Sequence, residues 1–301
     1  MITLDHLTKQ FAETIAVNDV SFNVRAGEIF GLIGPDGAGK TTTLRVISTA
    51  MMPTRGRVSV DGRDVAQNAE DIKKILGYMP QRFALYPDLT VVENLNFFAD
   101  IFGSPQAERA ALIEKLLGFA RLENFKTRYA KNLSGGMQKK LALAATLMHR
   151  PRVLLLDEPT TGVDPVSRRE FWDLLAQLHL DGVTIVISTP YLDEAERCTR
   201  VALMHRGKLI ANDAPNQLRA NLAAFVYEGH SAHARRAERA LQKHAGILNL
   251  NTYGDVIRLI VDDAARIDSI QNVWHTQNIV VQNLRPVGAR LEDVFVLAMS
   301  R

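Results

Sequence analysis

The chain has 301 residues, 47% of them hydrophobic, with 36 lysines and arginines against 33 aspartates and glutamates and a single cysteine. This apolar fraction excludes disorder for most of the chain, and at roughly 150 residues per domain we expect about two domains. The formal net charge of +3 gives no argument for nucleic-acid binding. No apolar run approaches the ~18 residues of a spanning helix, and the start lacks a signal-peptide pattern, so we expect a cytoplasmic location.

Residues 1–65 favour β-structure. Alternating apolar positions and β-branched side chains predict strands at 2–7, 16–24 and 57–60. A short apolar run at 28–33 lies between them and leads directly into glycines. A strand that ends in a glycine loop and is followed by a helix is typical of phosphate-binding sites.

The middle of the chain changes from helical to alternating patterns. From about residue 89 to residue 150 the apolar period lengthens towards 3.6, which predicts a mostly helical segment. Two strongly apolar runs, 153–156 and 183–187, flank a helical pattern at 165–180. Such strands alternating with helices favour a parallel sheet that is covered on both faces. A hairpin with its turn at Arg206 and Gly207 is predicted over residues 201–210.

A second, smaller domain is expected over residues 216–301. Its predicted elements are a strand (225–228), a helix (232–244), a hairpin (247–251 and 256–261), a helix (266–275), a strand (279–284) and a last helix (291–299). The order βαββαβ is that of the ferredoxin-like α+β motif.

The glycine loop matches the P-loop pattern G-x-x-x-x-G-K-[ST] between a predicted strand and a predicted helix. In this pattern, backbone N–H groups surround a phosphate, the lysine reaches the β- and γ-phosphates, and the hydroxyl can bind Mg²⁺. A glycine-rich turn without this function is the weaker alternative, because the flanking elements are also in order. The loop residues are Gly34, Pro35, Asp36, Gly37, Ala38, Gly39, Lys40 and Thr41.

Two carboxylates, Asp157 and Glu158, end the apolar run at 153–156. Ligands of open parallel sheets bind beyond the carboxyl ends of the strands, so Asp157 can hold magnesium and Glu158 can orient a water. An acidic pair taken alone is more often a solvated turn. About 120 residues after a P-loop, the functional interpretation is favoured.

A second candidate anion site begins at Ser134, which is suited to cap the helix that follows it. Gly135 and Gly136 expose the backbone at this helix start. Taken alone, Ser-Gly-Gly is a weak loop signal, and its weight comes from the other motifs.

Five motifs in this order resemble the nucleotide-binding subunit of ABC transporters. They are the P-loop, Tyr78-Met79-Pro80-Gln81, Leu133-Ser134-Gly135-Gly136-Met137, Leu154-Leu155-Leu156-Asp157-Glu158-Pro159 and Gly162-Val163-Asp164-Pro165. The resemblance covers residues 1–215. It implies a P-loop α/β nucleotide-binding domain with an N-terminal antiparallel β region and a helical subdomain at about 89–150. Within the family, the P-loop sequence and the tail sequence at 291–295 are similar to those of drug-export ATPases that pair with ABC-2-type permeases. They are particularly similar to those of the first ATPase half of YbhF-type exporters.

The resemblance also implies roles for individual residues. Glu158 would be the catalytic base or water-orienting group, and Phe11 would stack on adenine, although an ordinary strand-end aromatic stays an alternative. Thr42 would join the P-loop in binding ATP, and Thr41, Gln81 and Asp157 would bind Mg²⁺. Residues Leu133 to Met137 would close over the ATP of a second ATP-binding domain, and Asp164 would communicate across that interface.

One position departs from the family pattern. Pro190 lies where the family usually carries the switch histidine that contacts the γ-phosphate and braces the glutamate. Proline has no side-chain donor to replace it. Hydrolysis at this chain's own P-loop is therefore expected to be slow or to depend on Glu158 alone.

The expected protein is an ATPase subunit on the inner face of the cell membrane, powering multidrug-like export through a separate ABC-2-type permease. It would act in a homodimer or heterodimer with a second ATP-binding domain. Two alternatives stay open: a regulatory or slow half-site paired with an intact ATPase, and an ABC protein without a permease. The sequence does not identify the cargo.

Overall fold

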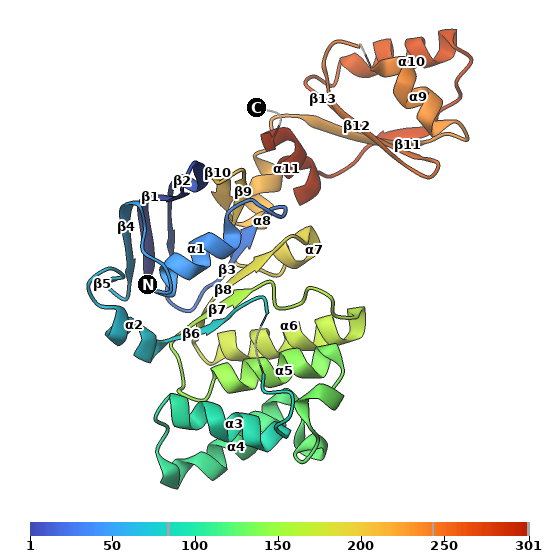
Figure 1. Ribbon diagram of the computed structural model, residues 1–301. Coiled ribbons are helices and arrows are strands. Elements are labelled where there is room, and N and C mark those ends of the chain that lie inside the picture. Colours follow the sequence, from blue (N-terminus) through green and yellow to red (C-terminus); the bar gives the residue numbers. More distant parts are fainter. Residues whose placement is uncertain (83–84, 243, 300–301) are drawn as a thin grey trace. The chain divides into compact units, whose positions relative to one another are not determined.

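The computed structural model describes residues 1–82, 85–242 and 244–299 (Figure 1). The chain divides into two compact units, Met1–Asn212 and Asp213–Arg301, each described here by itself. The domain boundary expected from the sequence falls just after this division. Within the described residues, no helix has both the length and the hydropathy to cross a bilayer.

The first unit begins with an antiparallel sheet in the order β2-β1-β4-β5. Its long strands are β1 (Ile2–Phe11), β2 (Thr14–Val24) and β4 (Arg55–Val60), and β5 (Arg63–Asp64) is a short edge strand. Ile2 pairs with Val24 and with Val60, so apolar residues on three strands face one core. The predicted N-terminal antiparallel region is confirmed, although the strands are longer than their apolar patterns.

The second sheet is mainly parallel and has the order β10-β9-β3-β8-β7-β6. β3 pairs in parallel with β8 and β9, and β7 pairs in parallel with β6 and β8. Every residue of β3, β7 and β8 is buried, as expected when helices cover both faces of a parallel sheet. The strands are β3 (Ile29–Ile33), β6 (Leu76–Met79), β7 (Val153–Asp157), β8 (Thr184–Thr189), β9 (Arg200–His205) and β10 (Lys208–Asp213).

The turn between β9 and β10 lies where the sequence predicts it. Arg206 and Gly207 have φ values of 48° and 77°. Positive φ at both central residues is the requirement of a type I′ two-residue hairpin turn.

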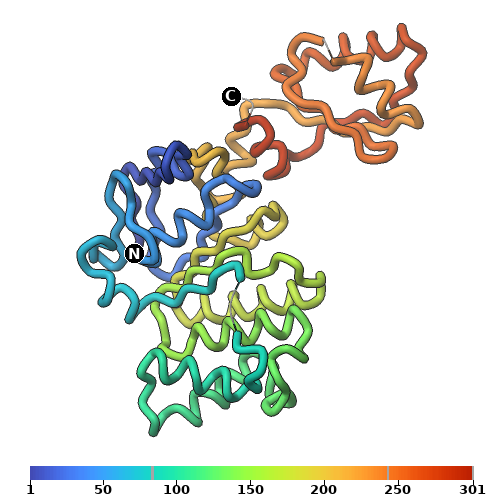
Figure 2. Tube along the Cα trace, viewed as in Figure 1, coloured from blue at the N-terminus to red at the C-terminus, as the bar shows by residue number. Residues whose placement is uncertain are grey.

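The chain leaves the sheet after β6, forms a helical part, and returns as β7 beside β6, as the trace in Figure 2 shows. The helical part contains α3 (Val91–Ile101), α4 (Gln106–Ala120) and α5 (Gly135–Thr146), and α5 packs on α6 (Pro165–Leu180). Thr90 and Glu93 form a reciprocal capping box that fixes the start of α3. The predicted helical segment at 89–150 is confirmed.

Several short elements have too little periodicity to be predicted from the sequence. They are β5, β6, α2 (Ala69–Ile75), α7 (Leu192–Ala195) and α8 (Pro215–Ala220). α1 (Lys40–Ile47) follows the glycine loop as predicted. The lone thiol, Cys198, is buried against Gly31 of β3.

The second unit has a four-stranded antiparallel sheet in the order β12-β13-β11-β14. One face packs on two helices around Trp274, whose indole N–H donates to Ala237 O at 2.9 Å. The elements in chain order are β11 (Phe225–His230), α9 (Ala234–Leu241), β12 (Ile247–Tyr253), β13 (Val256–Val261), α10 (Arg266–Thr276), β14 (Gln282–Pro286) and α11 (Leu291–Met299).

Two predicted boundaries in this unit are wrong. The strand predicted at 279–284 begins only at Gln282, because the Ile279 N–H bonds back to Trp274 O at 2.9 Å and so closes α10. The helix predicted at 232–244 is shorter in the structure, since α9 spans Ala234–Leu241. Residue 243 lies outside the described residues.

Candidate active site

The glycine loop joins β3 to α1 at the carboxyl edge of the parallel sheet. A Cβ on Gly34 would lie 2.2 Å from Met204 O, and one on Gly39 would lie 2.6 Å from Ala16 O. Gly39 also has a φ of 101°, which L side chains avoid. Gly37 has a φ of 77° with open space beside it. The outer glycines therefore let the loop fit between neighbouring backbones, and Gly37 lets its tip turn.

Lys40 points back into the loop that precedes it. Its Nζ donates to Gly34 O at 2.8 Å and to Pro35 O at 3.1 Å. The same ammonium lies 3.1 Å from Oε1 of Glu158, with both side chains almost fully buried. The structure thus joins the P-loop lysine and the proposed catalytic carboxylate, which are 118 positions apart in the sequence.

Glu158 follows the last residue of β7 and has a φ of 47°. A non-glycine residue with this φ is locally strained, and such strain is concentrated at functional sites. Its Oε2 accepts from Gln81 Nε2 at 2.9 Å and from the Thr161 hydroxyl at 3.4 Å. Three side chains from three different segments therefore hold one carboxylate.

Asp157 is the last residue of β7, and only one of its oxygens is satisfied. Oδ1 accepts from the Thr41 hydroxyl at 2.9 Å and from the Ser188 hydroxyl at 2.7 Å. Oδ2 is buried and has no hydrogen-bond partner. An orphaned carboxylate oxygen beside a P-loop threonine suits a divalent cation.

A cavity of about 610 Å³ opens beside these groups. Thr42 lies in its wall with the rest of the loop tip, and Arg206 and the segment Thr14 to Ala16 also line it. Its lining residues are Thr14, Ile15, Ala16, Asp36, Gly37, Ala38, Gly39, Lys40, Thr41, Thr42, Gln81, Glu158 and Arg206.

Phe11 is not among the residues that line this cavity. The residue is 44% exposed at the end of β1, and the centre of its ring lies 5.1 Å from the Lys9 ammonium. The next part of the same hairpin, from Thr14 to Ala16, reaches the cavity instead.

The segment from Leu133 to Met137 lies outside the wall of the P-loop cavity. Ser134 caps α5 by accepting from Met137 N at 3.3 Å, and Leu133 is buried. Gly135 is exposed and lines a second cavity of about 350 Å³ with Gln81. The exposed start of α5 is therefore separate from the wall of this chain's own P-loop cavity.

Asp164 caps α6 and accepts from Ser167 N at 2.9 Å and Val166 N at 3.1 Å. These bonds hold the pKa of Asp164 below its ordinary value, the bond from Ser167 contributing most. A helix-capping role therefore accounts for this residue within the chain.

Pro190 follows β8 directly and supplies no side-chain donor to the site. The neighbouring segment is fixed by other contacts: Tyr191 N donates to Thr189 Oγ1 at 3.0 Å, and the Arg168 guanidinium lies 4.4 Å from the Tyr191 ring. In the buried layer beneath, Thr160 donates to Glu194 at 2.6 Å.

Sequence reasoning missed Ser188 and Thr161. Ser188 donates to Asp157 and accepts from Glu158 N at 3.0 Å. Its signal was a hydroxyl pair, Ser188 and Thr189, closing an apolar strand beside the one that ends in two acids. Thr161 gave no comparable signal, because a threonine in a loop is common.

The chain is similar to known proteins over its whole length. The ABC transporter family profile matches residues 17–161. The Nod factor export ATP-binding protein I of Burkholderia thailandensis is 42% identical over 306 residues, which cover 100% of this chain and 97% of that protein. The chain belongs to the ATP-binding proteins of ABC transporters.

A second relative is longer than this chain. The probable multidrug ABC transporter ATP-binding protein YbhF of Escherichia coli K12 is 40% identical over 304 residues, covering 98% of this chain and 51% of that protein. The chain therefore spans about half the length of this ABC relative. The expected resemblance to YbhF-type ATPases is confirmed.

The ABC fold is also matched by a solved structure. An ATP-binding cassette determined as a dimer in a post-hydrolysis state with ADP and Pi has a TM-score of 0.65 and 29% identity. The match covers 71% of this chain and 98% of that one. The predicted α/β cassette fold is confirmed.

A methyl group added at each of the two glycines after Ser134 should affect the stability of the fold differently. A Cβ on Gly136 would lie 2.5 Å from the Ser167 side chain on α6, whereas Gly135 has no neighbour within 4 Å. Gly136→Ala should therefore lower the free energy of unfolding by about 1–3 kcal/mol through overpacking, and Gly135→Ala by much less. Denaturant unfolding of both variants measures this. Adding Ser167→Gly to Gly136→Ala should restore part of the lost stability, because it removes the side chain that the new methyl group meets. Equal losses of stability in Gly135→Ala and Gly136→Ala would contradict the prediction.

Proposed function

We propose that this chain binds and hydrolyses ATP as the ATPase subunit of an ABC exporter. The buried contact between Lys40 and Glu158 carries the proposal, because it joins a phosphate-binding lysine to a carboxylate at the end of β7. Family membership supports ATP as the nucleotide.

The donor set fits Mg²⁺ bound with the nucleotide. Asp157 Oδ2 is buried without a partner, and the Thr41 hydroxyl lies on the other oxygen of the same carboxylate. Among the described residues, no three His, Cys, Asp or Glu side chains gather as a metal site, so nucleotide phosphates would complete the coordination with Thr41, Asp157 and Gln81. Bound Mg²⁺ would neutralise charge on the β- and γ-phosphates.

Lys40 and Glu158 would separate when nucleotide binds. The Lys40 ammonium exchanges the carboxylate and two loop carbonyls for phosphate oxygens, which offer it a greater negative charge. Glu158 is then free of its cation but keeps the hydrogen bond from Gln81. Its oxygen can orient a water for in-line attack on the γ-phosphorus and accept the proton of that water.

The exposed start of α5 would act on a nucleotide held by a second ATP-binding domain. Ser134 and Gly135 are exposed, and they lie outside the wall of the chain's own P-loop cavity. Asp164, which caps the neighbouring helix α6, would lie at the same interface. The similar cassette solved as a dimer supports such pairing, with a copy of this chain or with a different domain.

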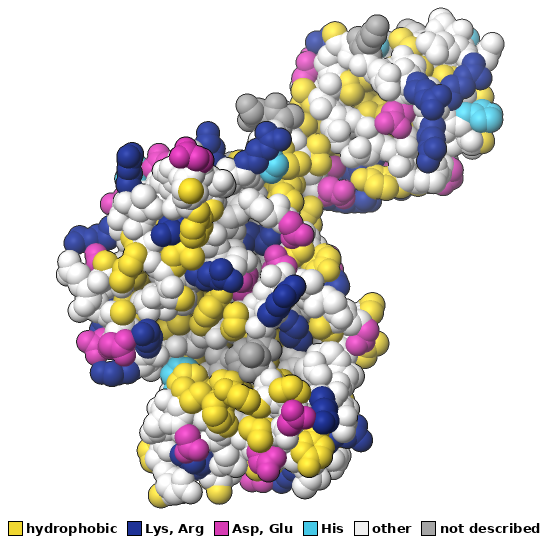
Figure 3. Space-filling view, viewed as in Figure 1, with side chains coloured by type: hydrophobic (Ala, Val, Ile, Leu, Met, Phe, Trp, Pro, Cys, Tyr) yellow, Lys and Arg dark blue, Asp and Glu magenta, His cyan; other side chains and the backbone are white. Residues whose placement is uncertain are grey.

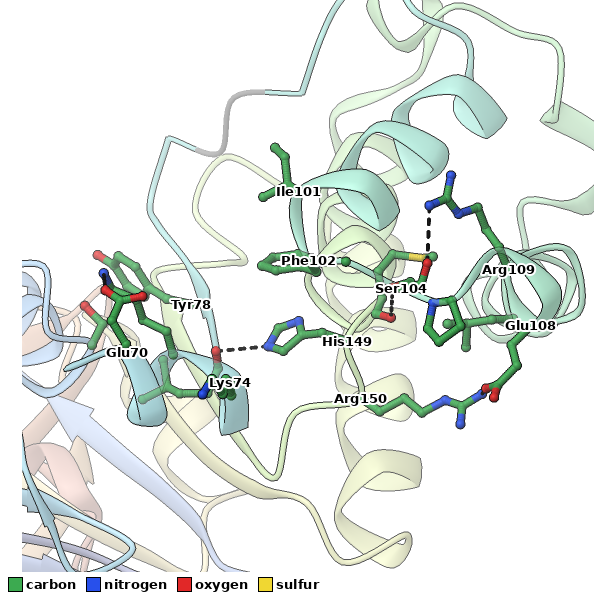
Figure 4. Close-up of a pocket in the computed structure, with 17 residues that line it drawn as sticks. Glu70, Lys74, Tyr78, Ile101, Phe102, Ser104, Glu108, Arg109, His149 and Arg150 are labelled. Carbon is green, nitrogen blue, oxygen red and sulfur yellow. Dashed lines mark hydrogen bonds and ion pairs between the residues drawn. The ribbon is translucent and has the colours of Figure 1, made fainter. Parts of the chain in front are cut away.

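A separate permease of the ABC-2 type would dock at a groove of about 760 Å³ between the sheet and the helical part. Figure 4 shows Phe102 next to His149 in its wall, and their ring centroids are 4.2 Å apart. Ile101 and Phe102 are 58% and 39% exposed, and Figure 3 shows hydrophobic side chains gathered on this helical part. Burial lowers the pKa of His149, which favours the neutral form of this imidazole in the groove.

The names of the relatives support a class of cargo, and family membership supports a place at the membrane. Their names assign multidrug transport and Nod factor export, so this chain would drive export of small molecules from the inner face of the membrane. The second unit would be a ferredoxin-like accessory domain. Its chain order βαββαβ and strand order β12-β13-β11-β14 support this assignment.

A second candidate is a slow or regulatory half-site, and Pro190 favours it. Without a switch histidine, the water-orienting carboxylate relies on Gln81 and Thr161 once Lys40 has turned to the phosphates.

Glu158→Gln should lower steady-state ATP turnover about 10²–10⁴-fold without weakening ATP binding, because it removes the proton acceptor and the carboxylate that competes for Lys40 but keeps the shape. A phosphate-release assay and equilibrium ATP binding measure the two effects. Glu123→Gln is the matched control, because Glu123 is exposed on a short helix after α4 and lies outside the P-loop cavity. Unchanged turnover in Glu158→Gln would remove the basis of the proposed function.

Pro190→His should raise turnover about tenfold, since it supplies the missing donor to the γ-phosphate. The measurement is single-turnover hydrolysis at saturating ATP, with the Glu158→Gln and Pro190→His double variant as the inactive reference. A fast wild-type rate that the substitution does not raise would contradict the slow half-site.

Ile101→Asp should reduce co-purification with the permease about tenfold, because it puts a charge into an apolar contact. Leu180→Asp is the control, since Leu180 is 85% exposed at the end of α6, outside the groove. Equal recovery of permease with both variants would exclude this groove as the docking site.

A further inference from the structure

Lys139 on α5 contacts the segment that holds the catalytic carboxylate. Its Nζ donates to the main-chain oxygen of Gln81 at 3.0 Å. The side chain of Gln81 in turn donates to Glu158 Oε2 at 2.9 Å. Gln81 therefore makes two contacts. Its main-chain oxygen accepts a hydrogen bond from the helical part, and its side-chain amide donates one to Glu158.

The contact lies in the second cavity, next to the exposed start of α5. Lys139, Gln81 and Gly135 all line this cavity of about 350 Å³, together with Thr161. Burial lowers the pKa of Lys139, whereas the charges of Glu158 and Asp157 act in the opposite direction. The ammonium is thus partly removed from water and lies within the electrostatic field of both acids.

The next residue along the helix shows what an ordinary structural lysine does here. Lys140 is buried and forms an ion pair with Glu170 of α6 at 2.9 Å, which fixes α5 on α6. Lys139 forms no ion pair with any described residue and instead donates to a carbonyl oxygen. Two successive lysines therefore tie α5 to two different partners, and only the contact of Lys139 leads to Glu158.

We propose that Lys139 is a positioning residue that couples α5 to Glu158 through Gln81. This inference rests on the proposed function, in which Glu158 orients the attacking water. A ligand at the exposed N-terminus of α5 would shift this helix relative to the sheet. Such a shift would move Gln81, and Gln81 would move the Glu158 carboxylate. Pro190 offers no side-chain donor that could help to position Glu158. The position of Glu158 therefore depends more on Gln81 and Lys139 than it would in a site with a switch histidine.

The first test compares Lys139→Met and Lys139→Arg with wild type. Lys139→Met keeps most of the apolar stem and removes the donor, so kcat should fall about tenfold while KM for ATP changes less than about twofold. Lys139→Arg keeps a cationic donor and should retain most of kcat. Lys115→Met, an exposed lysine of α4, is the control and should behave as wild type.

A double-variant cycle tests whether the effect passes through Gln81. Gln81→Ala removes the amide that contacts Glu158 but leaves the main-chain oxygen that Lys139 binds. In that background, Lys139→Met should cause no further loss of kcat. If the kcat losses of Gln81→Ala and Lys139→Met multiply in the double variant, the inference is overturned. A Lys139→Met variant with wild-type kcat would overturn it as well.

A readout without turnover separates this inference from the proposed function. Hydrogen exchange of the peptide containing Gln81 should be about tenfold faster in Lys139→Met than in wild type and unchanged in Lys115→Met. Unchanged exchange in Lys139→Met overturns the positioning role even if the protein proves inactive. Normal turnover in Glu158→Gln, in contrast, would overturn the proposed function and leave the contact of Lys139 with Gln81 intact.

Discussion

The buried ion pair between Lys40 and Glu158 is the constraint on which the site depends. Both side chains lie in the interior, so neither charge is compensated by water. Removing one partner of such a pair costs about 3–5 kcal/mol, because the other charge stays buried and unpaired. The pair therefore fixes the P-loop against β7 and, at the same time, makes the lysine respond to any stronger anion that enters the cavity.

Local motifs made much of this site predictable. The P-loop and the acids after β7 are short patterns whose spacing and flanking elements identify them in the sequence. Their meeting in space is a consequence of parallel strand order, since β3 and β7 both pair with β8 and end at the same edge. What the sequence cannot give is the side-chain partner of each acid. Gln81 and Glu158 are 77 positions apart, and nothing in their local sequence indicates that they touch.

The missed elements have a common physical cause. β6 has four residues and α7 has four, fewer than one full repeat of a recognisable pattern. The shifted start of β14 has another cause, because Ile279 is apolar and buried like a strand residue but completes a helix end. Packing of Gly136 against Ser167 was also hidden, since a glycine next to a glycine gives no sign of which one meets a neighbouring helix.

The burial of Cys198 has a practical consequence for spectroscopy. It is the single cysteine of the chain, it lies against Gly31 of β3, and burial raises the pKa of its thiol. A protonated, enclosed thiol reacts slowly with maleimides and other thiol reagents. The native chain is thus already suited to site-specific labelling: one cysteine introduced at an exposed position, for example by Leu180→Cys, accepts a spin label or fluorophore while Cys198 stays in place.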